Sequence, residues 1–105
     1  MASHEAITLD SVVTQVQSVM SADVGKELVV LHVEKNAYYD TDAIGADIWH
    51  RLAQPIRVRT LCDNFIQEYA VDPDTCYRDV LAFLNEAVQE DVVRVVSDAD
   101  SSAQA

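Results

Sequence analysis

The sequence is poor in glycine, cysteine and basic residues, and each shortage excludes a class of function. Gly25 and Gly45 are its only glycines, so a glycine-rich loop that cradles phosphates is not expected. No run of about 18 apolar residues is present, so we expect no membrane-spanning segment. The first residues lack a basic stretch followed by a long apolar one, which predicts no secretory signal and a cytoplasmic protein. In that compartment Cys62 and Cys76 are expected to be reduced thiols in the core.

Acidic residues strongly outnumber basic residues in this sequence. Seven Lys and Arg stand against 18 Asp and Glu, which gives the 105-residue chain a formal net charge of −11. Nucleic-acid binding needs cations that displace counterions from phosphate, so nucleic acid is not an expected partner. Anionic membranes are disfavoured for the same reason. A basic peptide or protein surface would be attracted, mainly through faster association, although the charge is equally consistent with solubility alone.

Residues that could bind a metal or act as nucleophiles are few. His4, His32, His50 and the two cysteines show no short metal-ligand spacing. A Cys–His nucleophile would need an exposed cysteine beside a base, and both cysteines lie at helical positions that are expected to be buried. We therefore predict no catalytic residue, no metal site and no cofactor.

The predicted strands lie in the first 40 residues, where apolar residues alternate or β-branched residues cluster. They are residues 12–19, 27–33 and 37–40. In the second segment we expect Val29, Leu31 and Val33 to face the core, and His32 to lie on the outer face. Residues 34–36 are predicted to form the turn into the third strand.

Three helices are predicted after the strands. The first begins at Asp42, whose carboxylate can cap the first turn, and ends before Pro55. The second begins near Thr60. Residues 92–96 are expected to form a short strand or an extended packing segment. Together these elements predict an α+β fold, with a three-stranded antiparallel sheet followed by three helices.

The third helix has the clearest start, at the sequence DPDT. Asp72 can cap it, Pro73 fits the first helical position, and the pattern continues to about Glu90. Its apolar residues cover an arc of roughly 160°, whereas a stripe of about 100° is enough to face one core. The surplus can pack under the other helices or cover a second neighbour. Beside the edge of the short third strand, it would make a site for an added peptide strand.

Two stretches resemble the PqqD-like family of small peptide-recognition domains: YYDTDAIGADIW at 38–49 and VRTLCDNFIQEYAVDPDTCYRDVLAFLNEAV at 58–88. They are most similar to the stand-alone members found with lasso-peptide biosynthesis, known as RiPP recognition elements. The resemblance covers about residues 12–96. It implies a winged-helix-like domain that binds the leader segment of a precursor peptide as an added strand, on the third strand and against the third helix. Such domains are not enzymes.

In the lasso-peptide members, the resemblance implies delivery of the precursor to a cysteine protease that removes the leader, and a separate cyclase then closes the ring. Carried across residue by residue, the implied peptide-binding positions are Asn36, Ala37, Tyr38, Tyr39, Asp40, Cys76, Asp79, Val80 and Phe83. The three apolar helix residues would form a wall, and Asp79 would meet a basic leader residue. Ordinary strand and core packing, and a solvated helix face for Asp79, remain the competing interpretations.

The alternation of side chains along a strand places Tyr39 on one face with Ala37 and Thr41, and Tyr38 on the other. The family pattern has glycines where Asn36 and Asp91 stand here. Asn36 can adopt the left-handed conformation that such a turn requires.

The predicted organisation has a flexible N-terminus at 1–10, the recognition domain at 11–96 and a disordered acidic tail at 97–105. We expect a monomer when the domain is free. Two other functions stay open. One is a PqqD-type peptide chaperone that serves a radical enzyme in quinone-cofactor or other peptide-modification pathways. The other is a winged-helix DNA-binding regulator, which the acidic third helix disfavours.

Overall fold

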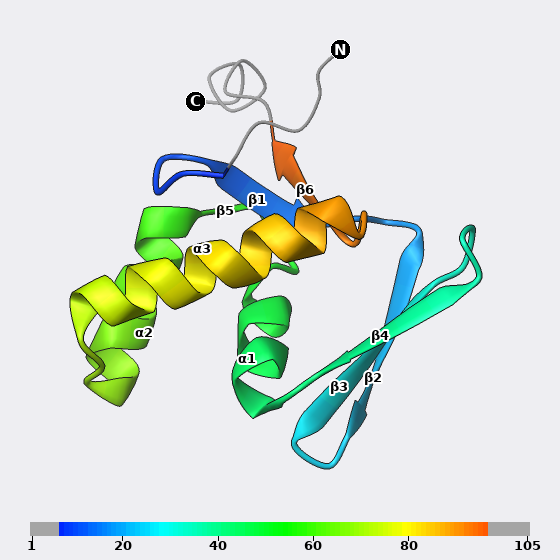
Figure 1. Cartoon of the computed structure of the whole chain (residues 1–105), viewed down its shortest axis with the longest axis horizontal. Coiled ribbons are helices and arrows are strands. Elements are labelled where there is room, and N and C mark those ends of the chain that lie inside the picture. Colours follow the sequence, from blue (N-terminus) through cyan, green and yellow to red (C-terminus); the bar gives the residue numbers. More distant parts are fainter. Residues whose placement is uncertain (1–6, 97–105) are drawn as a thin grey trace.

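The computed structural model describes residues 7–96. In chain order the elements are β1 (Val12–Gln15), β2 (Val19–Val24), β3 (Glu27–His32), β4 (Ala37–Thr41), α1 (Ala43–Arg51), β5 (Ile56–Arg57), α2 (Val58–Tyr69), α3 (Pro73–Gln89) and β6 (Val93–Val96) (Figure 1). The predicted tail at 97–105 and residues 1–6 of the predicted flexible start lie outside this part of the chain.

The strands form two antiparallel sheets. One has the order β2-β3-β4, and the other has the order β5-β1-β6. Figure 1 shows the first sheet on one side of the molecule and α2 on the other, with α1 between them and α3 running across towards β4. The predicted fold class, a three-stranded antiparallel sheet followed by three helices, is therefore confirmed, and the small second sheet is an addition to it.

The single strand predicted over residues 12–19 is wrong. Residues 12–15 form β1, which pairs with β6 from Val12↔Val96 to Gln15↔Val93, whereas Val19 already belongs to β2 and pairs with His32. The chain changes sheets between them. Alternation along a sequence reports extended backbone but does not report which neighbour the backbone pairs with. The extended segment predicted over 92–96 is confirmed as β6.

The predicted inner face of β3 is also wrong. Leu28, Val30 and His32 are 0%, 5% and 1% exposed, whereas Leu31 and Val33 are 40% and 53% exposed. A shift of one residue moves every side chain of a strand to the opposite face. The three residues that we expected to face the core, Val29, Leu31 and Val33, thus lie on the opposite face of the strand. His32 points into the core instead.

Burial of His32 is possible because both ring nitrogens have partners. Its Nε2 lies 3.2 Å from Asp91 Oδ2, and its Nδ1 accepts a hydrogen bond from the backbone N–H of Lys35 at 3.3 Å. Since Nδ1 is an acceptor, the ring hydrogen of the neutral imidazole lies on Nε2 and is donated to Asp91. This contact joins the β3–β4 hairpin to the segment that follows α3.

The core extends back into the segment that we expected to be flexible. Ile7 is 4% exposed, and its N–H donates to Asn85 Oδ1 on α3 at 3.0 Å. Leu9 packs against the same core. Ile7 and Leu9 therefore belong to the packed part of the chain.

Both cysteines lie in this core, as predicted. Cys62 and Cys76 are free thiols and are buried, and the Cys76 thiol points at the Cys62 carbonyl oxygen, 3.8 Å away. Burial raises the pKa of Cys62 to about 12. A thiol with so high a pKa holds almost no thiolate at neutral pH and is a poor nucleophile.

The predicted helix caps are confirmed. Asp42 accepts a hydrogen bond from the N–H of Gly45 at 2.9 Å and begins α1, and Asp72 accepts one from the N–H of Thr75 at 3.0 Å and begins α3. The second helix begins at Val58, two residues earlier than expected. The caps were predictable because they join residues only three positions apart.

Ala70 ends α2 in the left-handed conformation with φ 53°, and its N–H donates to Ile66 O at 2.9 Å. Alanine pays a steric cost in this conformation that glycine does not. We expect Ala70→Gly to raise the free energy of unfolding by about 0.5–1 kcal/mol. Urea denaturation followed by circular dichroism measures this change.

The matched control for this prediction is Ala82→Gly, at an exposed position inside α3. There glycine only loosens the helix, and the free energy of unfolding should fall by about 1 kcal/mol. Equal destabilisation by the two variants would show that the end of α2 is not under this constraint.

Candidate functional site

The edge strand β4 forms one side of the candidate site. Within residues 7–96 it pairs with β3 alone, so the backbone N–H and C=O groups along its other side are open to a further strand. Ala37, Tyr39 and Thr41 are half-buried, whereas Tyr38 and Asp40 are exposed, which confirms the predicted alternation.

A first hollow, the strand-side pocket, lies between this sheet and the C-terminal half of α3. Its volume is about 370 Å³. It is lined by Leu28, Val30, Tyr38, Tyr39, Asp40, Thr41, Trp49, Phe83, Glu86, Ala87, Glu90 and Val92. Most of the lining is apolar, with carboxylates at its border.

Two polar features mark the strand-side pocket. The Glu90 carboxylate lies beside the Tyr39 hydroxyl and raises the pKa of Tyr39. The two residues bring β4 and the end of α3 together at this pocket. Trp49 is 2% exposed, and its indole Nε1 has no hydrogen-bond partner within residues 7–96. A buried donor without an acceptor costs about 1–3 kcal/mol, so the indole N–H is an unused donor among the residues that line this pocket.

A second hollow, the helix-side pocket, lies between the three helices and has a volume of about 620 Å³. It is lined by Asp42, Ile44, Gly45, Ile48, Phe65, Tyr69, Val71, Thr75, Cys76, Asp79, Val80 and Phe83. Phe83 belongs to both linings, so the two pockets adjoin at this residue. Together they form one interrupted groove along α3, which begins beside β4.

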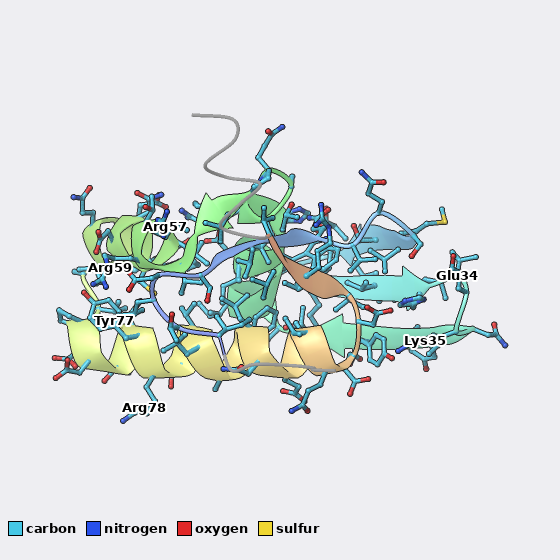
Figure 2. All side chains as sticks on the ribbon, turned by 90° about the horizontal axis from the view of Figure 1, so that it is seen from above. Glu34, Lys35, Arg57, Arg59, Tyr77 and Arg78 are labelled. Atoms are coloured by element: carbon cyan, nitrogen blue, oxygen red, sulfur yellow. The ribbon has the colours of Figure 1, made fainter. Side chains whose placement is uncertain are left out.

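The groove is acidic and has no cation in its walls. Asp40, Glu86 and Glu90 line the strand-side pocket, Asp42 and Asp79 line the helix-side pocket, and neither lining contains Lys, Arg or His. In Figure 2 the labelled cations lie elsewhere: Lys35 at the hairpin tip, Arg57 and Arg59 near the start of α2, and Arg78 pointing outward from α3. The groove therefore favours a ligand with apolar and basic side chains.

The structure brings most of the predicted site residues together, but in two groups. Tyr38, Tyr39 and Asp40 line the strand-side pocket, Cys76, Asp79 and Val80 line the helix-side pocket, and Phe83 lines both.

The other two predicted residues, Asn36 and Ala37, line neither pocket. Asn36 occupies the hairpin turn with φ 52°, the left-handed conformation expected for it, and Ala37 begins β4. Cys76 and Val80 are only 6% and 5% exposed, so they support the groove from the core side.

Sequence reasoning missed several residues of the groove. Three of them could have been predicted, because Glu86, Ala87 and Glu90 follow Phe83 at helical spacing and therefore share its face. No local pattern predicts Ile44, Tyr69 and Val71, because they come from α1, α2 and the following loop and meet only in the folded chain.

The comparisons with known proteins agree with this architecture. Residues 27–93, from the start of β3 into β6, match the family model described as Coenzyme PQQ synthesis protein D (PqqD). The match covers more than half of the chain, which belongs to this family. No curated protein sequence matches.

A solved structure matches as well. It is described as TbiB1 in complex with the TbiA(beta) leader peptide, and it is 30% identical to this chain with a TM-score of 0.73. The match covers 80% of this chain and 98% of that one. The chain is thus similar in sequence and in fold to a protein that binds a leader peptide.

Residues 7–96 contain no group of three or more His, Cys, Asp or Glu side chains arranged to hold a metal ion. None of the helices there has the length and apolarity needed to cross a membrane.

Proposed function

We propose that this domain binds the leader segment of a ribosomally made precursor peptide as a strand added to β4. The observation that carries the proposal is the open edge of β4 beside an apolar groove on α3. Main-chain hydrogen bonds to the strand edge supply affinity, and side chains that enter the pockets supply selectivity. The likeness to TbiB1, whose structure contains a leader peptide, supports the same ligand.

The proposed contacts follow the geometry of the groove. Asn36, Ala37, Tyr38, Tyr39 and Asp40 provide the pairing strand. Phe83 provides the main apolar contact, supported from below by Cys76 and Val80, and Asp79 faces a basic leader residue. The half-buried face of β4, with Tyr39 and Thr41, points towards α3, so every second leader side chain enters the groove.

The domain itself is proposed to be non-catalytic. In this role it delivers a lasso-type precursor to a cysteine protease that removes the leader, before a cyclase acts. Holding the leader raises the effective concentration of the cleavage site at the protease, which speeds the reaction without any chemistry by the domain.

A second candidate keeps the binding mode and changes the enzyme. The match to the PqqD family supports a peptide chaperone that serves a radical enzyme in quinone-cofactor biosynthesis or another peptide-modification pathway. A protease and a cyclase encoded beside this gene would support the first candidate, and a radical enzyme encoded there would support the second. A DNA-binding regulator is disfavoured, because its recognition helix would have to be α3. This helix and its C-cap carry one cation, Arg78, against the four carboxylates of Asp74, Asp79, Glu86 and Glu90.

The test is a titration of the protein into a fluorescent synthetic leader from the precursor encoded beside the gene, followed by a backbone N-methyl scan of that leader. In an added strand, every second residue points its N–H at the partner strand. N-methylation at those positions should weaken binding by about tenfold each, with small effects at the positions between them.

The unmodified leader at the same concentration is the control for the scan. Loss of affinity without this period of two would contradict strand addition, even if the leader binds. No binding of the unmodified leader to the folded domain would overturn the proposed function itself.

A further inference from the structure

Asp91 has a backbone conformation that favours glycine. It follows the C-cap of α3 with φ 65°, in the left-handed region where a side chain adds a steric cost. The N–H of Asp91 donates to Val88 O at 3.0 Å, and the N–H of Val92 donates to Ala87 O at 3.1 Å. These backbone bonds fix the point from which the Asp91 carboxylate leaves the end of α3.

The Asp91 carboxylate reaches His32 on the inner face of β3. Asp91 Oδ2 lies 3.2 Å from His32 Nε2, and the Lys35 N–H holds the ring from its other side by donating to Nδ1 at 3.3 Å. Because His32 is only 1% exposed, loss of the Asp91 carboxylate would leave a buried ring N–H without its acceptor. This pair, which we call the His32–Asp91 latch, joins positions 59 residues apart.

The latch acts at the end of β4 that α1 does not hold. At its C-terminal end β4 passes at once into α1, because Asp42 caps that helix directly after Thr41. At its other end, Ala37 pairs with His32 in the β3–β4 ladder. Through His32, the latch therefore holds the Ala37 end of the open strand edge to the end of α3.

The latch also lies beside the strand-side pocket. Glu90 and Val92, the residues on either side of Asp91, line this pocket. Tyr39 lines it from β4. Neither His32 nor Asp91 belongs to the lining. The latch can therefore act on a ligand of the pocket by positioning these two walls relative to each other.

We infer that His32 and Asp91 are positioning residues for leader binding. They hold the Ala37 end of β4 against the end of α3 before the leader arrives, so that the free protein already has the arrangement that binds. Without the latch this end of the hairpin moves, and the leader binds only the fraction of molecules in which both walls are in place. This inference rests on the proposed function and adds two residues that act without touching the leader.

The experiment titrates the fluorescent leader with wild type, Asp91→Gly and Asp91→Asn, all confirmed to be folded by circular dichroism. Glycine keeps the left-handed backbone but removes the carboxylate, so affinity should fall about 3–10-fold. Asparagine tolerates the same conformation, and its side-chain oxygen can accept from His32 Nε2, so affinity should stay within about twofold of wild type. Equal losses in both variants would assign the effect to the charge of Asp91 and overturn the latch, as would unchanged affinity in both.

A double-variant cycle tests whether the two residues act as a pair. His32→Phe keeps a ring in the core and removes both hydrogen bonds, while the Asp91 side chain, 56% exposed, stays in contact with water. It should weaken binding about as much as Asp91→Gly, and the double variant should lose no more than either single one. Losses that multiply would contradict the latch.

Val58→Ala is the control for a general loss of stability, because Val58 is fully buried at the start of α2 and lines neither pocket. It should lower the urea midpoint and still bind like wild type. Without leader, Asp91→Gly should speed amide hydrogen exchange selectively at residues 33–37, whereas Val58→Ala should not single out this hairpin. Wild-type binding with no effect of the latch variants would leave the proposed function standing, and failure of wild type to bind any leader would overturn both.

Discussion

Phe83→Asp is expected to weaken leader binding at least about 100-fold, because it places a charge in the middle of the groove. Phe83 lines both pockets, and the carboxylates of Asp40, Asp79 and Glu86 lie among the same linings. The variant therefore removes the apolar contact that the two pockets share and adds a negative charge where a desolvated ligand would lie. Anisotropy titration of the fluorescent leader measures the loss.

Ala82→Asp is the control for this experiment, because it makes the same charge change at the neighbouring, exposed position of α3. Its affinity should stay within about threefold of wild type, as for a screened surface charge. Binding that survives Phe83→Asp would keep a leader-binding function and move its site away from the groove. Circular dichroism of both variants separates lost contact from lost fold.

Gly45→Val is expected to lower the free energy of unfolding by about 3 kcal/mol or more, since α1 approaches two neighbours at this residue. A Cβ on Gly45 would lie 1.7 Å from Thr41 Oγ1, 2.9 Å from Thr41 Cβ and 3.1 Å from Phe83 Cε1. The Thr41 hydroxyl can rotate away, but its Cβ moves only with the backbone of β4. The start of α1 and the end of β4 must therefore move apart, and the Phe83 ring must give way as well, so that the groove bounded by β4 and Phe83 is disturbed.

Ala43→Val tests whether this effect belongs to the close approach or to valine in a helix. Ala43 is exposed at the start of the same helix, so the control should lose only about 0.5 kcal/mol of helix propensity. Chemical denaturation gives both values. Similar losses for the two variants would show that the contact between α1, β4 and Phe83 does not limit the residue at position 45.

The two predictions meet at one place in the fold. Thr41 ends β4, Gly45 is the third residue of α1, and the Phe83 ring of α3 approaches Gly45. The absence of a side chain at Gly45 allows α1 to lie close to both the end of β4 and the Phe83 ring, which border the groove. Binding and stability therefore depend on the same contact, and the leader titration and the denaturation experiment examine it independently.

Much of the domain was predictable from the sequence because it depends on contacts between residues close together in the chain. Asp42 and Asp72 cap helices whose first turns lie three residues away. The alternation that turns Tyr39 inward and Tyr38 outward is a property of any strand. The left-handed turn at Asn36 follows from the tolerance of asparagine for that conformation. Phe83 was identified through a resemblance whose motifs lie in α1 and α3.

The parts that only the tertiary structure decided depend on residues far apart in the chain. His32 lies inside because its partner Asp91, 59 residues later, and the Lys35 N–H satisfy both ring nitrogens. The burial of His32 fixes which face of β3 points into the core. Residues 12–15 lie outside the β2-β3-β4 sheet because they pair with β6, which comes from the other end of the domain. Likewise, Ile44, Tyr69 and Val71 form one pocket wall only after three segments have packed, since no local pattern records which apolar side chains will meet.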